Sequence, residues 1–229
     1  MRQTLSGDEH RGMAMRARHI VLRLAVLMAA AAPASASADP LPHQVGALFA
    51  MTPDQFAAAA DVKDDALETV ATISTMRGWQ QHDGLLGIVN DDGFFRAFVD
   101  KTSGETRFQV YHMVRYTEQH RARFEVVNYE TPDGPVSVPL IPIGRYRGSC
   151  RVYVGCAYLE TFAFPVDEAL LRTLAAKYLP GRVAVWKYRL KAKTGAERDE
   201  GFAPAEIAGM LIAVDHYRAA HGLTGAQTR

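Results

Sequence analysis

In two stretches of the chain, residues 106–116 and 183–192, apolar and polar residues alternate over most positions. This alternation is typical of half-buried β-strands. In each stretch the apolar side chains share one face and the polar side chains share the other: Phe108, Val110, Val114 and Tyr116 against Arg107, Gln109 and Arg115, then Ala184, Trp186, Tyr188 and Leu190 against Lys187, Arg189 and Lys191. We therefore expect both strands to lie in antiparallel sheets that have one solvated face.

Further strands are predicted where β-branched and aromatic residues gather between turn-forming residues. These strands are expected at residues 67–76, 85–89, 94–99, 123–129 and 157–164. The turns are expected at Asn90–Gly93, Lys101–Gly104 and Pro132–Pro135. Residues 136–143 contain Pro139 and Pro142, which cannot donate to a sheet ladder. That segment is therefore expected to be an edge strand or an extended segment.

Three segments carry helix signals. Thr52-Pro53-Asp54-Gln55 reads as a capping box with proline at the first helical position, and it predicts a helix that ends near residue 60. Residues 166–178 hold an apolar stripe that Pro180-Gly181 ends. From Pro204 onward, apolar residues recur with the i, i+3, i+4, i+7 spacing of an amphipathic helix, until Gly222.

The order of elements is one helix, many strands, a helix, a strand and a helix. This order predicts an α+β fold: a twisted antiparallel sheet of about six to eight strands with helices packed on one face. A β-sandwich with peripheral helices is the alternative. No repeat or long linker divides the chain, so residues 39–222 are expected to form a single domain. Residues 223–229 are expected to be a disordered tail.

Residues 1–38 have the form of an export signal. Positive residues precede the apolar run Leu24–Ala32, and Ala36–Ala38 matches the small-residue pattern at a cleavage site. Acidic residues at the very start fit such a signal poorly, so we expect translation to begin at Met13 or Met15. The apolar run is shorter than the about 20 residues that span a bilayer. We therefore predict a soluble periplasmic or secreted protein with no membrane anchor after cleavage.

Cysteine usage agrees with export, because the chain has two cysteines, Cys150 and Cys156. A straight strand would separate them by ~20 Å. A disulfide requires Cα atoms within about 7 Å of each other. If the two cysteines pair, the chain must turn between them, and Gly155 is the natural place. We favour the disulfide over two buried free thiols.

The charge of the chain argues against a nucleic-acid partner. The sequence holds 26 Lys+Arg and 25 Asp+Glu, of which residues 1–38 hold five and two, so residues 39–229 carry 21 basic and 23 acidic groups. Nucleic-acid-binding domains normally show a strong basic excess.

Motif inspection finds no recognised catalytic or cofactor-binding pattern. The sequence lacks the G-x-S-x-G elbow, the H-E-x-x-H zinc motif and a glycine-rich phosphate loop, and Asn90–Gly93 does not fit a calcium loop. We therefore assign no catalytic residue, metal or cofactor, and the enzyme question stays open, with a non-enzyme preferred.

His112 and a group of basic residues are the candidate binding residues. Alternation places His112 on the apolar face of its strand, where a histidine is a pocket base or ligand, or a core histidine whose nitrogens are satisfied. We favour the core histidine. Arginines and tyrosines concentrate between residues 107 and 158, and Lys187 and Arg189 form a basic strand face. The candidate binding set is His112, Arg107, Arg115, Lys187 and Arg189.

These observations favour a non-catalytic exported protein that binds an anionic small molecule, a glycan or an envelope protein through its polar sheet face. Two alternatives stay open: a hydrolytic enzyme whose site is assembled from distant residues such as His112 and a carboxylate, and a cell-envelope assembly factor. If acidic neighbours neutralise the basic face evenly, the binding hypothesis loses that support.

Overall fold

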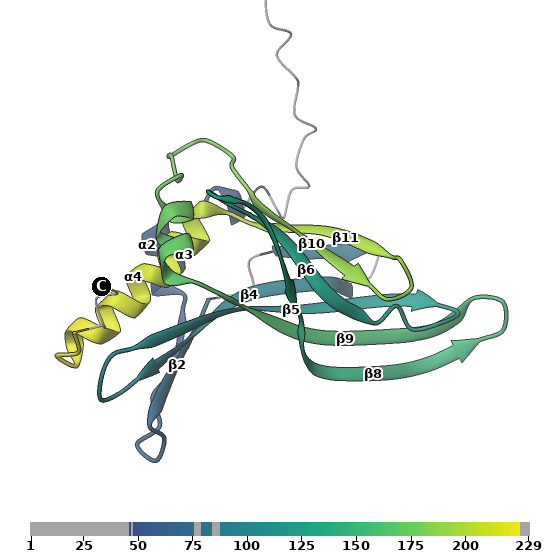
Figure 1. The fold of residues 1–229 in the computed structure, drawn as a ribbon, viewed down its shortest axis with the longest axis horizontal. Helices are drawn as coiled ribbons and strands as arrows, with labels where there is room; N and C mark the ends of the chain where they lie inside the picture. The colour runs from purple at the N-terminus through teal and green to yellow at the C-terminus, as the bar shows by residue number, and fades with distance from the viewer. Residues whose placement is uncertain (1–45, 47, 76–78, 84–87, 225–229) are drawn as a thin grey trace, which may run out of the picture. The chain divides into compact units, whose positions relative to one another are not determined.

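The computed structural model of the protein describes residues 46, 48–75, 79–83 and 88–224, and all of them belong to one compact unit. Helices gather at the left of Figure 1, and the hairpins β8–β9 and β10–β11 point to the right. The strands are β1 (Asp61–Lys63), β2 (Val70–Ser74), β3 (Trp79–Asp83), β4 (Ile88–Asp100), β5 (Thr106–Glu118), β6 (Phe124–Thr131), β7 (Gly134–Pro139), β8 (Ile141–Arg151), β9 (Gly155–Val166), β10 (Trp186–Ala192) and β11 (Glu197–Phe202). The helices are α2 (Pro53–Ala58), α3 (Glu168–Ala175) and α4 (Pro204–Ala220).

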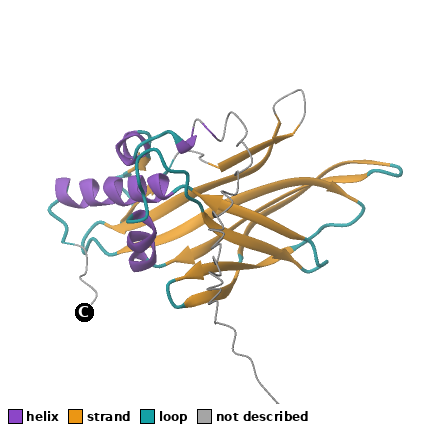
Figure 2. Ribbon diagram, turned by 90° about the horizontal axis from the view of Figure 1, so that it is seen from above, coloured by secondary structure: helices purple, strands orange, loops and turns teal. Residues whose placement is uncertain are grey.

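The strands form two antiparallel sheets, which confirms the α+β class. The larger sheet has seven strands in the order β1-β2-β4-β5-β9-β8, with β3 paired to β4, and the smaller has four in the order β11-β10-β6-β7. Figure 2 shows the helices gathered at one end of the strands. The larger sheet has the predicted size. The smaller sheet was not expected as a separate layer.

The core lies where the inner faces of the two sheets meet. Phe95 of β4 lies 4.3 Å from Phe202 of β11, between ring centroids, and Phe164 of β9 lies 5.4 Å from Tyr188 of β10. At the other end of the larger sheet, α4 packs against β2 and β4, with α2 and α3 beside it. Gly209 lets α4 approach α2 closely, because a Cβ there would lie 2.4 Å from the Cβ of Phe56.

The predicted turn at Asn90–Gly93 is wrong, because β4 runs through it without interruption. β3, which precedes it, pairs with its first half. Gly93 is present for space: an added Cβ would lie 2.9 Å from Nδ1 of His112 and 3.1 Å from Phe202. A glycine that admits a close neighbour inside a strand looks, in sequence, like a glycine that makes a turn.

Residues 123–143 depart from the expected meander. β6 leaves the larger sheet and pairs with β7 and β10 in the smaller one. The segment with two prolines becomes two edge strands in different sheets, β7 and β8, joined through the buried Leu140. Strand β11 was not predicted, because its first four residues are all charged and it has no alternation of apolar and polar residues.

Several local predictions are confirmed. The side chain of Thr52 accepts from the backbone of Gln55, and the Gln55 side chain accepts from the backbone of Thr52, so the capping box forms. The turn at Lys101–Gly104 joins β4 to β5 as expected. The export signal lies outside the described residues and stays a prediction. Most of the predicted tail is also outside, but its first residue, Leu223, donates its N–H to the carbonyl of Arg218 at 2.8 Å and packs on the core.

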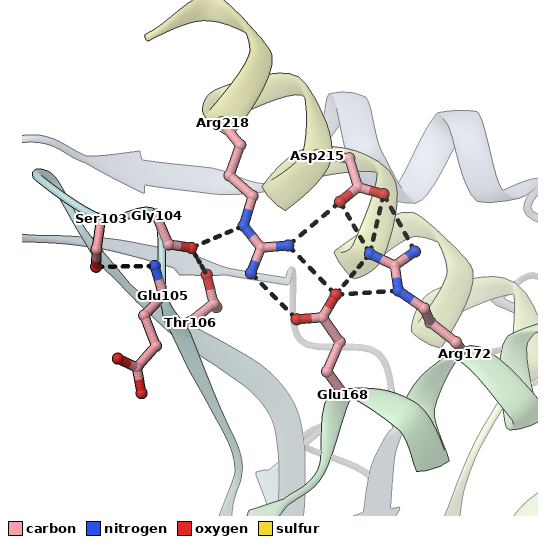
Figure 3. A network of polar contacts seen from close by, with 8 residues as sticks. All are labelled: Ser103, Gly104, Glu105, Thr106, Glu168, Arg172, Asp215 and Arg218. Atoms are coloured by element: carbon pink, nitrogen blue, oxygen red, sulfur yellow. Dashed lines mark hydrogen bonds and ion pairs between the residues drawn. The ribbon is translucent and has the colours of Figure 1, made fainter. Parts of the chain in front are cut away.

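A network of charged side chains ties α3, α4 and the β4–β5 turn together (Figure 3). Arg218 of α4 donates to the carbonyl of Gly104 at 3.0 Å and to both oxygens of Glu168 at 3.1 and 3.2 Å. Arg172 joins Glu168 to Asp215 through further short contacts. Burial acts to raise the pKa of Glu168, but hydrogen bonds from Arg218 and Arg172 outweigh it and hold that pKa below its usual value. We call α2, α3, α4 and this turn the helical end.

Candidate functional site

The five predicted binding residues do not converge. His112 lies in the core between the sheets, and it is completely buried. Arg107 and Arg115 are exposed on the opposite face of β5. Lys187 and Arg189 are exposed on the outer face of the smaller sheet. The predicted set is therefore divided among three places.

His112 bridges the two sheets. Its Nδ1 lies 2.9 Å from the hydroxyl of Tyr188, and its Nε2 lies 3.9 Å from a carboxylate oxygen of Glu200. Burial, together with the charge of Arg198, lowers the pKa of His112 to about 3, so the ring is neutral at pH 7. The core position is the one favoured from the sequence, but only one ring nitrogen is satisfied: Nδ1 pairs with Tyr188, whereas Nε2 has no hydrogen-bond partner among the described residues.

The basic face of β10 is neutralised by its neighbour β11. The guanidinium of Arg189 makes two contacts with Asp199, at 2.5 and 2.9 Å, and Lys191 lies 3.5 Å from Glu197. A hollow of about 320 Å³ on this face includes Asp199 as well as Lys187 and Arg189. Because acids match the bases here, this face offers little excess charge to an anion.

Arg107 lies in a second hollow, of about 420 Å³. Its guanidinium lies 5.9 Å from the ring centroid of Phe98. The opposite wall carries Asp167 and Glu168, so an anionic ligand would face two carboxylates there. Arg115 does not line this hollow. The structure therefore gives Arg107 and Arg115 no shared pocket.

A third region lies at the other end of the strands from the helices, where three connections meet (right of Figure 1). We call it the loop end, formed by residues 119–123, by residues 145–154 at the end of β8 and the tip that follows it, and by residues 193–196. The backbone N–H of Lys193 donates to the carbonyl of Arg123 at 2.9 Å, which joins two of these loops. The third loop, residues 151–154, is followed by Gly155, which packs closely against the end of β5. A Cβ at position 155 would lie 2.3 Å from the carbonyl oxygen of Glu118, so this approach requires glycine.

The loop end gathers arginines from segments that are far apart in the sequence. The group consists of Arg121 and Arg123 on the β5–β6 loop and Arg145, Arg147 and Arg151 on β8. Of these five, Arg145 has a carboxylate within 4 Å, that of Glu160 at 3.5 Å, and the other four have none among the residues that the structure describes. This region therefore carries positive charge that few acids neutralise, unlike the face of β10.

A buried carboxylate, Glu160 of β9, fixes the β5–β6 loop in place. It accepts hydrogen bonds from the hydroxyl of Tyr116 and, at 3.0 Å, from the backbone N–H of Arg123. The Tyr116 hydroxyl in turn accepts from the N–H of Ala122 at 2.9 Å. Arg123 has a φ of 58°, a conformation that non-glycine residues seldom adopt unless their surroundings enforce it.

Sequence reasoning missed this anchor, although a signal was present. Glu160 lies between Tyr158 and Phe162 on the buried face of the strand predicted at 157–164. An acid on an apolar face needs a hydrogen-bonding partner, because an unpaired buried charge is costly. Its hydrogen-bond partners come from Tyr116 of β5 and from Arg123 of the β5–β6 loop, about 40 residues earlier in the chain, which no local pattern indicates.

The loop end also contains a hollow of about 450 Å³, between the β5–β6 loop and the β10–β11 hairpin. Phe124 and Tyr116 supply aromatic surface, and His120 and Arg198 supply polar groups. Other lining residues include Glu118 and Glu197, both exposed. A lining that combines the partly exposed ring of Tyr116 with the guanidinium of Arg198 suits a ligand that has a ring or apolar body and a carboxylate or phosphate.

Cys150 and Cys156 form a disulfide beside this region, and their Cα atoms are 3.9 Å apart. The chain turns between them, and Gly155 has a positive φ of 107°, as the spacing predicted. Disulfides persist in oxidising compartments outside the cytoplasm.

Among the residues that the structure describes, no three histidine, cysteine or acidic side chains are grouped as a metal ion would require. No helix in the same part of the chain is both long and apolar enough to cross a bilayer.

Comparisons with protein-family models, with curated proteins and with solved structures find no match for this chain.

Proposed function

We propose that this protein is a non-catalytic, exported binding domain whose hollow at the loop end takes an anionic ligand. The observation that carries the proposal is the contrast in charge pairing. Four of the five arginines at the loop end have no carboxylate within 4 Å among the described residues, whereas Arg189 on the predicted binding face has Asp199. A hollow of about 450 Å³ lies beside the β5–β6 loop, which carries Arg121 and Arg123 on either side of the lining residue Ala122. The lining itself includes the guanidinium-bearing Arg198 and two acids, Glu118 and Glu197.

Export to the periplasm or the medium is supported by two features. The first is the signal-like sequence of residues 1–38. The second is the disulfide between Cys150 and Cys156, since such bonds are rare in the cytosol. An anionic envelope glycan or a small organic anion is the ligand class that suits such a location.

The chemistry of the hollow favours a ligand with a ring and an acidic group. Guanidinium forks bind carboxylates and phosphates through paired hydrogen bonds. The partly exposed ring of Tyr116, which packs against the buried Phe124, offers rigid surface to a sugar or other ring. The β5–β6 loop is already held by Glu160, so binding would not require that loop to become ordered.

A hydrolytic enzyme is the alternative, because Glu200 does lie near His112, as that hypothesis required. Burial argues against it. His112, Tyr188 and Glu200 are each at most 4 % exposed, and His112 titrates far below neutral pH. A general base must reach the proton that it removes from a substrate. A substrate would have to enter the packed core between the sheets.

Binding to an oligosaccharide of glucuronic acid tests the proposal. The test variant is Arg121→Ser/Arg123→Asn, because asparagine tolerates the positive φ at position 123. The matched control is Lys187→Ser/Arg189→Ser, which removes the same charge from the neutralised face. By calorimetry at low salt, we expect the test variant to weaken binding by about tenfold or more, since each lost charged hydrogen bond costs about 1.5–3 kcal/mol, and the control to change it less than about twofold.

Thermal unfolding of both variants checks that each is folded. Equal loss of affinity in the two variants would show that binding is non-specific and would contradict the proposed site. Absence of any salt-dependent binding to glucuronic acid oligosaccharides, inorganic phosphate or phosphorylated sugars would contradict the proposed ligand class.

A further inference from the structure

The tip of the β8–β9 hairpin exposes three consecutive residues, two of them valines. Val152 is 79 % exposed, Tyr153 is 95 % exposed and Val154 is 57 % exposed. Single exposed apolar residues are ordinary on protein surfaces, but a contiguous group at a projecting tip is not. Tyr146, Ile143 and Ile141 continue the apolar exposure along β8, which is the outer strand of its sheet.

Tyr153 is a poor choice for the backbone of this turn. Its φ is 69°, in the left-handed region that glycine and asparagine adopt at lower cost. An aromatic side chain at this position contributes nothing to the packing, because nearly all of its surface faces solvent. A strained residue with an unused side chain points to a role outside the fold.

The tip is held rigidly at its base. The Cys150–Cys156 disulfide closes the hairpin just behind it, and Arg147 donates to both sulfur atoms at 3.2 Å. Gly155 packs against the backbone of Glu118. The tip therefore keeps its projecting conformation without a partner, which lowers the entropy lost when it inserts into one.

Arginines flank the apolar tip. Arg151 directly precedes Val152, and Arg147 lies four residues before Arg151 on the same strand, β8. Both side chains are exposed, and neither has a carboxylate within 4 Å in the described parts of the chain. Tyrosine and valine next to guanidinium groups match the layers of a lipid interface, where rings lie at the headgroup level and basic side chains contact phosphates.

We infer that this hairpin tip docks the protein onto an anionic lipid surface. Val152, Tyr153 and Val154 enter the boundary between headgroups and acyl chains, and Arg147 and Arg151 contact lipid phosphates. Charge complementarity selects a lipid surface with net negative charge. The contact is peripheral and reversible, since three residues bury little area compared with a spanning segment. It is separate from the proposed hollow, whose lining includes none of these residues.

Vesicle co-sedimentation tests the inference, with vesicles of phosphatidylglycerol and phosphatidylethanolamine against vesicles of phosphatidylcholine. We expect binding to the anionic vesicles only. Tyr153→Asn suits the left-handed backbone, so it keeps the fold, and Val152→Ser/Val154→Ser can be combined with it. We expect the triple variant to bind at least about tenfold more weakly. Arg151→Ser should weaken binding about fivefold, the effect expected for one basic residue at a charged surface.

A tryptophan reporter distinguishes insertion from simple charge attraction. Tyr153→Trp should show a blue-shifted emission on adding anionic vesicles and quenching by brominated lipid. Leu67→Trp is the matched control, because Leu67 is equally exposed, at 92 %, but lies on the connection between β1 and β2. Its emission should not change.

Equal responses from both reporters, or undiminished vesicle binding by the triple variant, would overturn the inference. If the triple variant loses binding to a proteinaceous envelope fraction but the wild type never binds protein-free vesicles, the tip contacts a protein and the lipid inference is wrong. Glucuronic acid binding by the triple variant should be unchanged, so the two proposals fail separately.

Discussion

The helical end and the loop end use the same side-chain type in opposite ways. At the helical end, Arg172 and Arg218 are each held by Glu168 and Asp215, so their charge stays within the protein (Figure 3). At the loop end, Arg147 and Arg151 have no carboxylate within 4 Å among the described residues. The comparison teaches that composition alone does not identify a binding surface, because pairing decides which charges a partner can reach.

The two ends also differ in the exposure of their apolar residues. Eleven of the 17 residues of α4 are buried, and the helix packs against the larger sheet and against α2 and α3. The hairpin tip leaves Tyr153 in solvent. If this division is correct, substitutions at the helical end should change stability, and substitutions at the loop end should change binding but leave stability nearly constant.

The largest expected effect is at Arg218, which is 9 % exposed. Arg218→Met removes donors from both oxygens of Glu168 and from the carbonyl of Gly104. Because the acceptors stay partly buried without it, we expect unfolding to cost about 3 kcal/mol less. Urea denaturation at pH 7 measures this. Arg151→Met at the loop end is the control and should stay within about 0.5 kcal/mol of the wild type; similar losses in both variants would remove the distinction.

The second effect concerns the disulfide, the covalent constraint at the base of the hairpin tip, where a substitution at the loop end should change stability. Replacing Cys150 and Cys156 with serine frees a short loop of the unfolded chain. In the chain-entropy account, we expect a loss of about 2 kcal/mol in unfolding free energy. Denaturation of the wild type with and without a reductant should reproduce the loss, and the serine variant should not respond to the reductant. A much larger loss would mean that the tip is integral to the core.

Local features of the fold could be predicted from the sequence, because their causes are local. The capping box at Thr52, the turn before β5 and the alternation in β10 depend on neighbouring residues alone. The two-sheet division could not be predicted in this way. Nothing near β6 indicates that it pairs with β10 rather than with β5, because the paired residues lie at least 59 positions apart in the chain (Tyr129 with Tyr188).

The sites show the same limit. The turn between Cys150 and Cys156 follows from their spacing, and the core position of His112 follows from alternation. The sequence showed that arginines cluster, but it did not show which of them are paired with acids. Arg189 pairs with Asp199 because β11 lies beside β10, and the sequence pattern did not predict β11. The sequence therefore predicted the residue type of the proposed site, arginine, but it selected arginines at other positions in the fold.

The third effect is a pH dependence from Glu206, at the start of α4. Burial, with a nearby charge on Asp92, raises the pKa of Glu206 to about 8, although Thr75 donates a hydrogen bond to it at 2.7 Å. The folded protein keeps this proton while the unfolded chain releases it above its ordinary pKa near 4.5. Stability from this group is therefore full below pH 4.5 and falls as the pH rises toward 8, by up to about 1.4 kcal/mol per pH unit.

Glu206→Gln keeps the hydrogen-bonding shape and removes the titration. Its unfolding free energy should vary less between pH 5 and pH 8 than that of the wild type, and it should be the more stable protein at pH 8. Denaturant titrations across that range measure both. If the two proteins lose stability in parallel as the pH rises, Glu206 is not the group responsible.

The smallest expected change in stability is at Tyr153. Asparagine adopts a positive φ at lower cost than tyrosine, and the side chain that is lost packs on nothing. We therefore expect Tyr153→Asn to raise the unfolding free energy by about 0.5 kcal/mol or to leave it unchanged. Differential scanning calorimetry measures this, and the result bears directly on why tyrosine is present. If Tyr153→Asn is at least as stable as the wild type but loses vesicle binding, the tyrosine serves contact with another surface. A clear loss of stability would instead show that Tyr153 contributes to the fold.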